Sequence, residues 1–148
     1  MSTPFLAITT AIRDALIASP AVVPASRVRR GRPAIAQTSE SSAIYIATER
    51  ANGKQLDVAG TMTEWETAVS VLIMARGTGT QDAHEAVDPL LESAWARLYA
   101  MTPPAGAQSC VIEPHVTWDA DLVDQVVGTA SLILRVTHHT TGGALAAP

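Results

Sequence analysis

Apolar and polar side chains alternate between residues 64 and 73, and this alternation constrains the fold more than any other feature of the sequence. Four large apolar residues in "EWETAVSVLIMARG" fall on one face of an extended chain: Trp65, Val69, Val71 and Ile73. Glu64, Glu66 and Ser70 fall on the other face. Because successive side chains of a strand point to opposite faces, the segment predicts a strand with one face in a core.

Two further segments predict strands beside this one. The first, "AIYIATE", spans about Ala43 to Glu49, and Asn52-Gly53 follows it with residues that tolerate positive φ. We therefore expect a long hairpin whose connection includes Asn52-Gly53. The second, "VVGTASLILRVTHH", places Ala130, Leu132, Leu134 and Val136 on one face. If both segments join one sheet, its buried face includes Trp65, Val69, Val71, Leu132 and Leu134.

Two amphipathic helices are expected. Near the N-terminus, Thr3 can cap a helix that begins with Pro4 and has an apolar stripe: Phe5, Ile8, Ile12 and Leu16. A second stripe follows Asp82: Ala83, Val87, Leu90, Leu91, Ala94 and Leu98. Pro89 lies inside this second pattern, and we expect it to kink or split the helix.

The remaining elements are signalled more weakly. Residues 27–30 are consistent with a short strand, and "CVIEPHVTW" with another, which an acidic turn from Asp119 to Asp124 would follow. The order of elements predicts an α+β fold, a mainly antiparallel sheet with two helices packed on it. We expect a single domain over residues 1–140 and a flexible tail over 141–148, since that tail is rich in Gly and Ala.

The charge is unevenly distributed. "RVRRGRPAI" holds four arginines in a chain of net charge −4: Arg27, Arg29, Arg30 and Arg32. Between Asp82 and Asp124, eight acidic residues stand against the single base Arg97. Opposite charges in two regions suit head-to-tail contact between copies, and the four arginines are the candidate interface. The alternative is two solvated charged faces.

No catalytic, cofactor-binding or metal-binding residues are predicted. His84 and Asp88 stand four apart on a helix, but no second ligand pair accompanies them, and they are expected to be exposed. Neighbouring His138 and His139 would point to opposite faces of a strand. Cys110 has the surroundings of a small buried apolar residue. The acids near Asp119 lack the glycine and the terminal glutamate of a calcium loop. We therefore do not expect an enzyme.

The composition also bears on binding to nucleic acid and to membranes. The arginine cluster has no interleaved aromatic residues, whereas single-strand binders combine positive charge with stacking platforms. Trp65, Trp95 and Trp118 lie in amphipathic segments and are expected in the core. No apolar run reaches the roughly 18 residues that a membrane span needs. No basic segment precedes the first apolar run, so a signal peptide is not expected. A single cysteine cannot form an internal disulfide, and we therefore expect a protein made in the cytoplasm.

The ordered set of segments resembles the tail terminator proteins of long-tailed bacteriophages, the minor tail protein U-like family. The resemblance extends from about Phe5 to His139 and rests on six segments: the first amphipathic helix, "GRPA" at 31–34, "AIYIATE", "EWETAVSVLIMARG", "DAHEAVDPLLESAW" and "GTASLILRVTHH". The Pro/Ala-rich segments at 20–26 and 102–107 and the Gly/Ala tail depart from the family's pattern.

This resemblance implies an α+β protein that forms a hexameric ring without catalytic residues or cofactors. Such a ring binds the end of the tail tube, stops tube polymerisation and presents a surface for the filled head. The implied partners are further copies of the chain, the tail tube protein and a head-completion protein, with DNA passing through the lumen. The implied location is the head-proximal end of the virion tail, after assembly in the host cytoplasm. The alternatives are another neck or head–tail joining protein and a nucleic-acid-binding module that uses Arg27 to Arg32.

Overall fold

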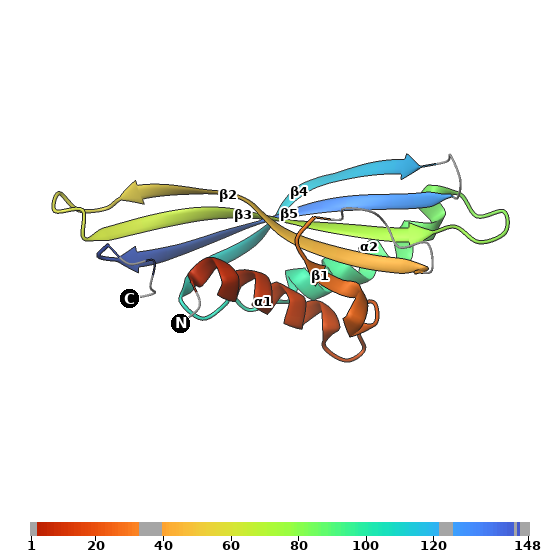
Figure 1. The fold of residues 1–148 in the computed structure, drawn as a ribbon, viewed down its shortest axis with the longest axis horizontal. Coiled ribbons are helices and arrows are strands. Elements are labelled where there is room, and N and C mark those ends of the chain that lie inside the picture. Colours follow the sequence, from red (N-terminus) through yellow and green to blue (C-terminus); the bar gives the residue numbers. More distant parts are fainter. Residues whose placement is uncertain (1–2, 33–39, 122–125, 144, 146–148) are drawn as a thin grey trace.

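Two helices cover one face of a five-stranded, mostly antiparallel sheet (Figure 1). The computed structural model describes residues 3–32, 40–121, 126–143 and 145. The chain order is α1 (Pro4–Ile17), a 3-10 turn (Ala25–Arg27), β1 (Val28–Arg30), β2 (Ser42–Gln55), β3 (Met62–Arg76), α2 (Ala83–Tyr99), β4 (Ala107–Asp121) and β5 (Val127–Thr141). The sheet order is β1-β2-β3-β5-β4, and β1 pairs with β2 in parallel. The predicted α+β class is confirmed.

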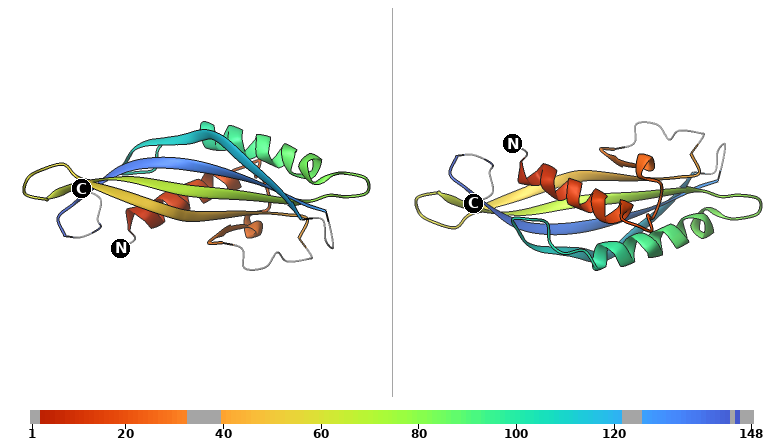
Figure 2. Two further views of the ribbon diagram at one scale, coloured as in Figure 1. Left: turned by 90° about the horizontal axis from the view of Figure 1, so that it is seen from above. Right: turned by 90° about the horizontal axis from the view of Figure 1, so that it is seen from below.

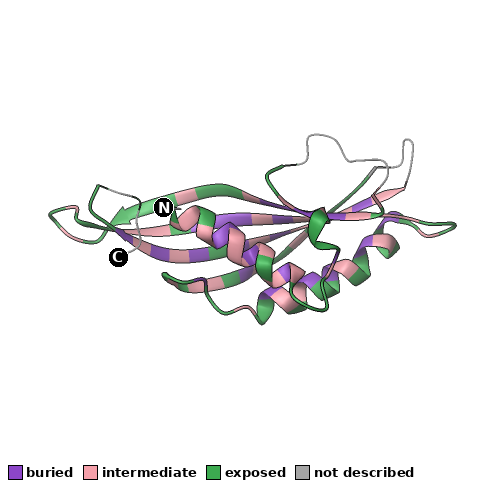
Figure 3. Ribbon diagram, turned by 60° about the horizontal axis from the view of Figure 1, so that its bottom comes forward, coloured by how far each residue is buried: buried purple, intermediate pink, exposed green. Residues whose placement is uncertain are grey.

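The predicted alternation places the core between the sheet and the helices. In β3 and β5 nearly every second side chain is buried, which produces the striped strands of Figure 3. Val69, Val71, Leu132 and Leu134 are fully buried, as expected. Two tryptophans differ from the expectation. Trp65 is only half-buried, because it lies near the end of the helix layer beside Phe5, and Trp118 lies on the outermost strand β4 with 47% of its surface exposed.

The hairpin of β2 and β3 continues past the expected turn. Asn52-Gly53 lies within β2, paired with Glu66 and Trp65 of β3. The connection is formed by residues 56–61, where Asp57 accepts hydrogen bonds from the backbone N–H groups of Thr61 (2.7 Å) and Met62 (3.3 Å). Gly60 adopts a positive φ of 66°, which glycine favours. The prediction of a turn at Asn52-Gly53 is wrong, and the hairpin extends as an arm beyond the helices (Figure 1).

Helix α2 is continuous through Pro89, so of the two expected effects of this proline, a kink or a split, the split is wrong. Proline has no N–H to donate to the carbonyl of Glu85, four residues earlier. The side-chain amide of Gln81 donates to that carbonyl instead, at 3.3 Å. Asp82 and Glu85 form a reciprocal capping box at the helix start. Local side chains thus supply the hydrogen bonds that the proline and the helix start leave open.

The last two strands are longer than expected. Asp119 and Asp121 belong to β4 rather than to an acidic turn, because they pair with Thr129 and Val127 of β5, and Asp124 lies outside the described residues. In the middle of β4, a bulge between Ile112 and Val116 includes Pro114. Strand β5 takes in Thr141, the first residue of the expected tail.

The molecule is elongated, and its two ends differ. The arm of β2 and β3 forms one end, and the connection from β3 into α2 forms the other (Figures 1 and 2). Both helices lie against the same side of the sheet, so no helix of the described residues covers the opposite side (Figure 2).

Candidate interface at the arginine segment

The short strand β1 directs consecutive arginines to different sides. Strand β1 aligns Arg29 with Tyr45 and Arg30 with Ile46 of β2. Since alternate side chains point to opposite faces, Arg29 lies on the uncovered side with Tyr45. The Arg30 guanidinium donates a 3.1 Å hydrogen bond to Thr10 of α1, on the helix side. The four predicted arginines therefore do not form one patch.

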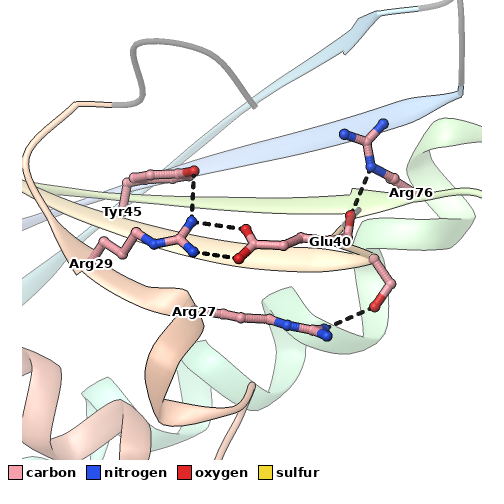
Figure 4. Close-up of polar contacts among 6 residues, drawn as sticks. Arg27, Arg29, Glu40, Tyr45 and Arg76 are labelled. Carbon is pink, nitrogen blue, oxygen red and sulfur yellow. Dashed lines mark hydrogen bonds and ion pairs between the residues drawn. The ribbon is translucent and has the colours of Figure 1, made fainter. Parts of the chain in front are cut away.

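Arg29 binds a carboxylate of its own chain. Its guanidinium forms a two-pronged ion pair with Glu40, with one N–O distance of 2.8 Å, and donates to the Tyr45 hydroxyl at 3.3 Å (Figure 4). Such paired hydrogen bonds are stronger than single ones and fix the orientation of both groups. Arg29 is consequently held against the start of β2.

Glu40 is the centre of a small polar cluster. Its backbone carbonyl accepts a 2.7 Å hydrogen bond from Nε of Arg76, and Arg27 donates to the Ser41 hydroxyl at 3.0 Å (Figure 4). The Arg29 pair, with the nearby charges of Arg27 and Arg76, holds the pKa of Glu40 below its usual value. The same pair raises the pKa of Arg29. The Glu40 side chain is 15% exposed, so this cluster is a partly covered ion pair that fastens β1 to β2 and β3.

Arg32 is also paired within the chain. It forms an ion pair with Glu49, which accepts a 2.6 Å hydrogen bond from the Ser70 hydroxyl as well. The Ser70 hydrogen bond, with a further contribution from Arg32, lowers the pKa of Glu49. Arg29 and Arg32 are therefore paired with Glu40 and Glu49 of their own chain, and Arg32 remains exposed, whereas Arg27 and Arg30 have no ion pair within the described residues.

The acids that neutralise the arginines were not identified from the sequence. Glu40 and Glu49 lie on either side of the apolar segment of β2, 11 and 17 residues from their arginine partners. Glutamates near a strand do not by themselves predict an ion pair, because the pairing of the strands decides which arginines they meet. Arg76 was missed because only the pairing of β2 with β3 brings the end of β3 to Glu40.

The uncovered side of the sheet contains a shallow hollow beside this segment. Most of the residues that line it are small or apolar, and the ion pair of Arg32 and Glu49 is also part of the lining. The lining residues are Gly31, Arg32, Tyr45, Ala47, Glu49, Ser70, Leu72 and Ser131. A second hollow continues across the sheet to Arg135, which is paired with Glu113 and Glu66. Arg32, Glu49, Glu113 and Arg135 are thus paired around these hollows, whereas Arg50, which lines the second one, has no ion pair within the described residues.

The other residues considered in the sequence are dispersed. His84 and Asp88 are both exposed on α2, as expected, and Cys110 is half-buried, which raises the pKa of its thiol. Within the described ranges, no three His, Cys, Asp or Glu side chains are placed to hold a metal ion together. No helix in the same ranges is long and apolar enough to cross a membrane. No family model and no curated protein matches this chain.

The two adjacent histidines lie on opposite faces, as expected. His139 is on the uncovered side, where its ring contacts Glu64 at 3.2 Å and Gln108 at 3.0 Å. His138 is 1% exposed and packs edge-on against Phe5 of α1, with ring centroids 5.1 Å apart. Neither ring nitrogen of His138 has a hydrogen-bond partner among the described residues, and burial lowers its pKa. This histidine is a buried polar group in the core.

Proposed function

We propose that this protein is a structural assembly protein of a long-tailed bacteriophage. In this proposal it forms a hexameric ring on the end of the tail tube, stops tube polymerisation and offers the surface to which the head attaches. Its partners are other copies of itself, the tube protein and a head-completion protein, and it acts without a cofactor or a catalytic step. It is assembled in the host cytoplasm and stays at the head-proximal end of the tail.

The observation that supports this proposal best is the one-sided cover of the sheet. Both helices pack on one face, and the opposite face keeps a hollowed surface with an apolar floor that includes Ala47 and Leu72. Such a surface is suited to contact with another protein, because burying its apolar part is favourable. The α+β architecture also agrees with the fold that the family resemblance implies.

A nucleic-acid-binding role for Arg27 to Arg32 is the weaker alternative. Affinity for the phosphate backbone comes from arginine and lysine charges that neutralise phosphates. Here Glu40 and Glu49 already neutralise Arg29 and Arg32, and the chain has a net charge of −4. A neck protein of related fold is the second structural alternative.

Negative-stain imaging with mass measurement of the purified protein tests the ring. The expected result is a closed ring with a mass near six chains. Addition of these rings to polymerising tail tube protein should give short tubes capped at one end. Uncapped tubes of unchanged length would refute the proposed function.

A further inference from the structure

The end of the β2–β3 arm exposes apolar side chains that its own chain does not cover. Leu56 and Met62 flank the turn and are substantially exposed, and Val58 at the tip is fully exposed at 109% of its reference surface. Three large exposed apolar residues within a seven-residue stretch are unusual for a polar loop. Their position at the end of a projecting arm favours contact with another molecule.

A second uncovered apolar group lies near the other end of the molecule. Trp118 of β4 pairs with Ala130, a core residue, and is therefore on the helix side of the sheet. Two residues further along β4, Ala120 pairs with Gly128, whose Cα lies against the carbonyl of Ala83 in the first turn of α2. Trp118 thus lies beside the start of α2, and it is 47% exposed.

The charges around these two apolar groups are opposite. On the arm, Arg50 and Lys54 are exposed and have no ion pair within the described residues. Glu64, which lies across from Lys54, contacts His139 instead. On α2, Asp88 and Glu92 are exposed, and neither has an ion-pair partner in the described part of the chain. The arm therefore has unpaired positive side chains between the sheet and its apolar tip, and the helix that begins beside Trp118 has unpaired negative side chains in its first three turns.

We propose that the arm of one copy docks on the Trp118–α2 surface of the next copy. The arm tip covers Trp118, and Arg50 and Lys54 lie opposite Asp88 and Glu92. The arm and the start of α2 are at opposite ends of the molecule (Figures 1 and 2), so one molecule cannot make this contact with itself. Two different surfaces joined in this way give a head-to-tail contact, which builds a closed ring when the rotation from one copy to the next brings the last copy back to the first. This contact rests on the proposed ring and names the surfaces that build it.

Two surface variants, one on each side of the contact, test it. Val58→Glu places a charge at the arm tip, and Tyr99→Glu is the control, because Tyr99 is an exposed residue at the last position of α2, at the opposite end of that helix from its start beside Trp118. Asp88→Lys with Glu92→Lys reverses the charge of the α2 surface. Circular dichroism confirms that each variant is folded, and sedimentation velocity measures association. We expect both surface variants to be monomeric, with association weakened at least about tenfold, and the control to assemble like the original chain.

Mixing the two surface variants gives the sharper result. Each retains the half of the contact that the other has lost, so an equimolar mixture should give one-to-one dimers that grow no further. A mixture that stays monomeric, or a Val58→Glu variant that assembles normally, would overturn the arm contact. Normal rings that cap tubes despite Val58→Glu would leave the proposed function standing and refute this contact. A third outcome separates the two proposals in the other direction. If the original chain forms open chains, the mixed variants form dimers and tube length is unchanged, the arm contact is supported and tube capping is refuted.

Discussion

At the scale of single residues, His138 makes stability depend on pH. Burial under Phe5, beside Trp65 on the paired strand, favours the neutral ring, so the pKa of His138 in the folded protein is below the usual value near 6.5. Below pH 6.5 the unfolded chain gains a proton that the folded chain does not take up. The free energy of unfolding should therefore fall as the pH drops through about 6.5 and level off once the folded-state pKa is passed.

Urea unfolding at about pH 7.5 and pH 5.5 measures this effect, and His138→Leu is the comparison. The variant should lose the part of the pH dependence that comes from this ring, while His139→Gln, on the solvent side, should largely retain it. An unchanged pH profile in His138→Leu would contradict the assignment.

Leu132 tests the core itself. It is fully buried between the helices and the middle of the sheet. Leu132→Ala removes apolar contacts and leaves a cavity, so the free energy of unfolding should fall by about 2–5 kcal/mol. Equilibrium denaturation provides the measurement. Ile133→Ala, the next residue on the uncovered face, is the control and should cost much less.

The pattern of residue types along the sequence predicted which residues form the core, but it did not predict the polar contacts. Leu132 and Val71 follow from alternation alone, because the period of a strand decides their face. The Arg29–Glu40 pair depends on the position of β1 against β2, and the His138–Phe5 contact joins the two ends of the chain. Neither contact has a local sequence signature, since each is created only when distant elements pack together.

At the scale of secondary structure elements, Gln81 allows α2 to continue through Pro89. Gln81→Ala would leave the Glu85 carbonyl without the donor that replaces the missing proline N–H. We expect a loss of about 1 kcal/mol in the free energy of unfolding. In a Pro89→Ala background, the restored N–H can bond to the same carbonyl, so Gln81→Ala should cost less there.

A double-mutant cycle of Gln81→Ala and Pro89→Ala, measured by thermal or urea unfolding, gives this coupling directly. Equal costs of Gln81→Ala in both backgrounds would show that the amide does not substitute for the proline N–H.

The position of the hairpin turn illustrates how packing can override a local turn signal. Asn52-Gly53 is a favourable turn pair, yet a Cβ at Gly53 would lie 2.9 Å from the ring of Trp65 on the paired strand. The glycine is needed for this close approach and not for a turn. The actual turn has its own signal in Asp57 and Gly60, which the stronger pair concealed in the sequence.

At the scale of the whole molecule, the internal pairing of arginines predicts weak binding to nucleic acid. In fluorescence anisotropy with a labelled DNA duplex, we expect no saturable binding at about 10 μM protein in about 150 mM salt. The assay should be repeated at low salt, where nonspecific phosphate contacts are strongest. Tight binding that falls steeply with salt would favour the nucleic-acid alternative over the structural proposal.

The bulge in β4 has a consequence for how copies of this protein meet. An outer strand with regular backbone is a template to which strands of other chains can add without limit, as in amyloid. In β4 the residues between Ile112 and Val116 leave the regular pairing, and Pro114 among them has no N–H to offer. The bulge interrupts that template near its middle. Addition of strands from further copies along this edge is therefore discouraged, and copies are left to meet through their side chains.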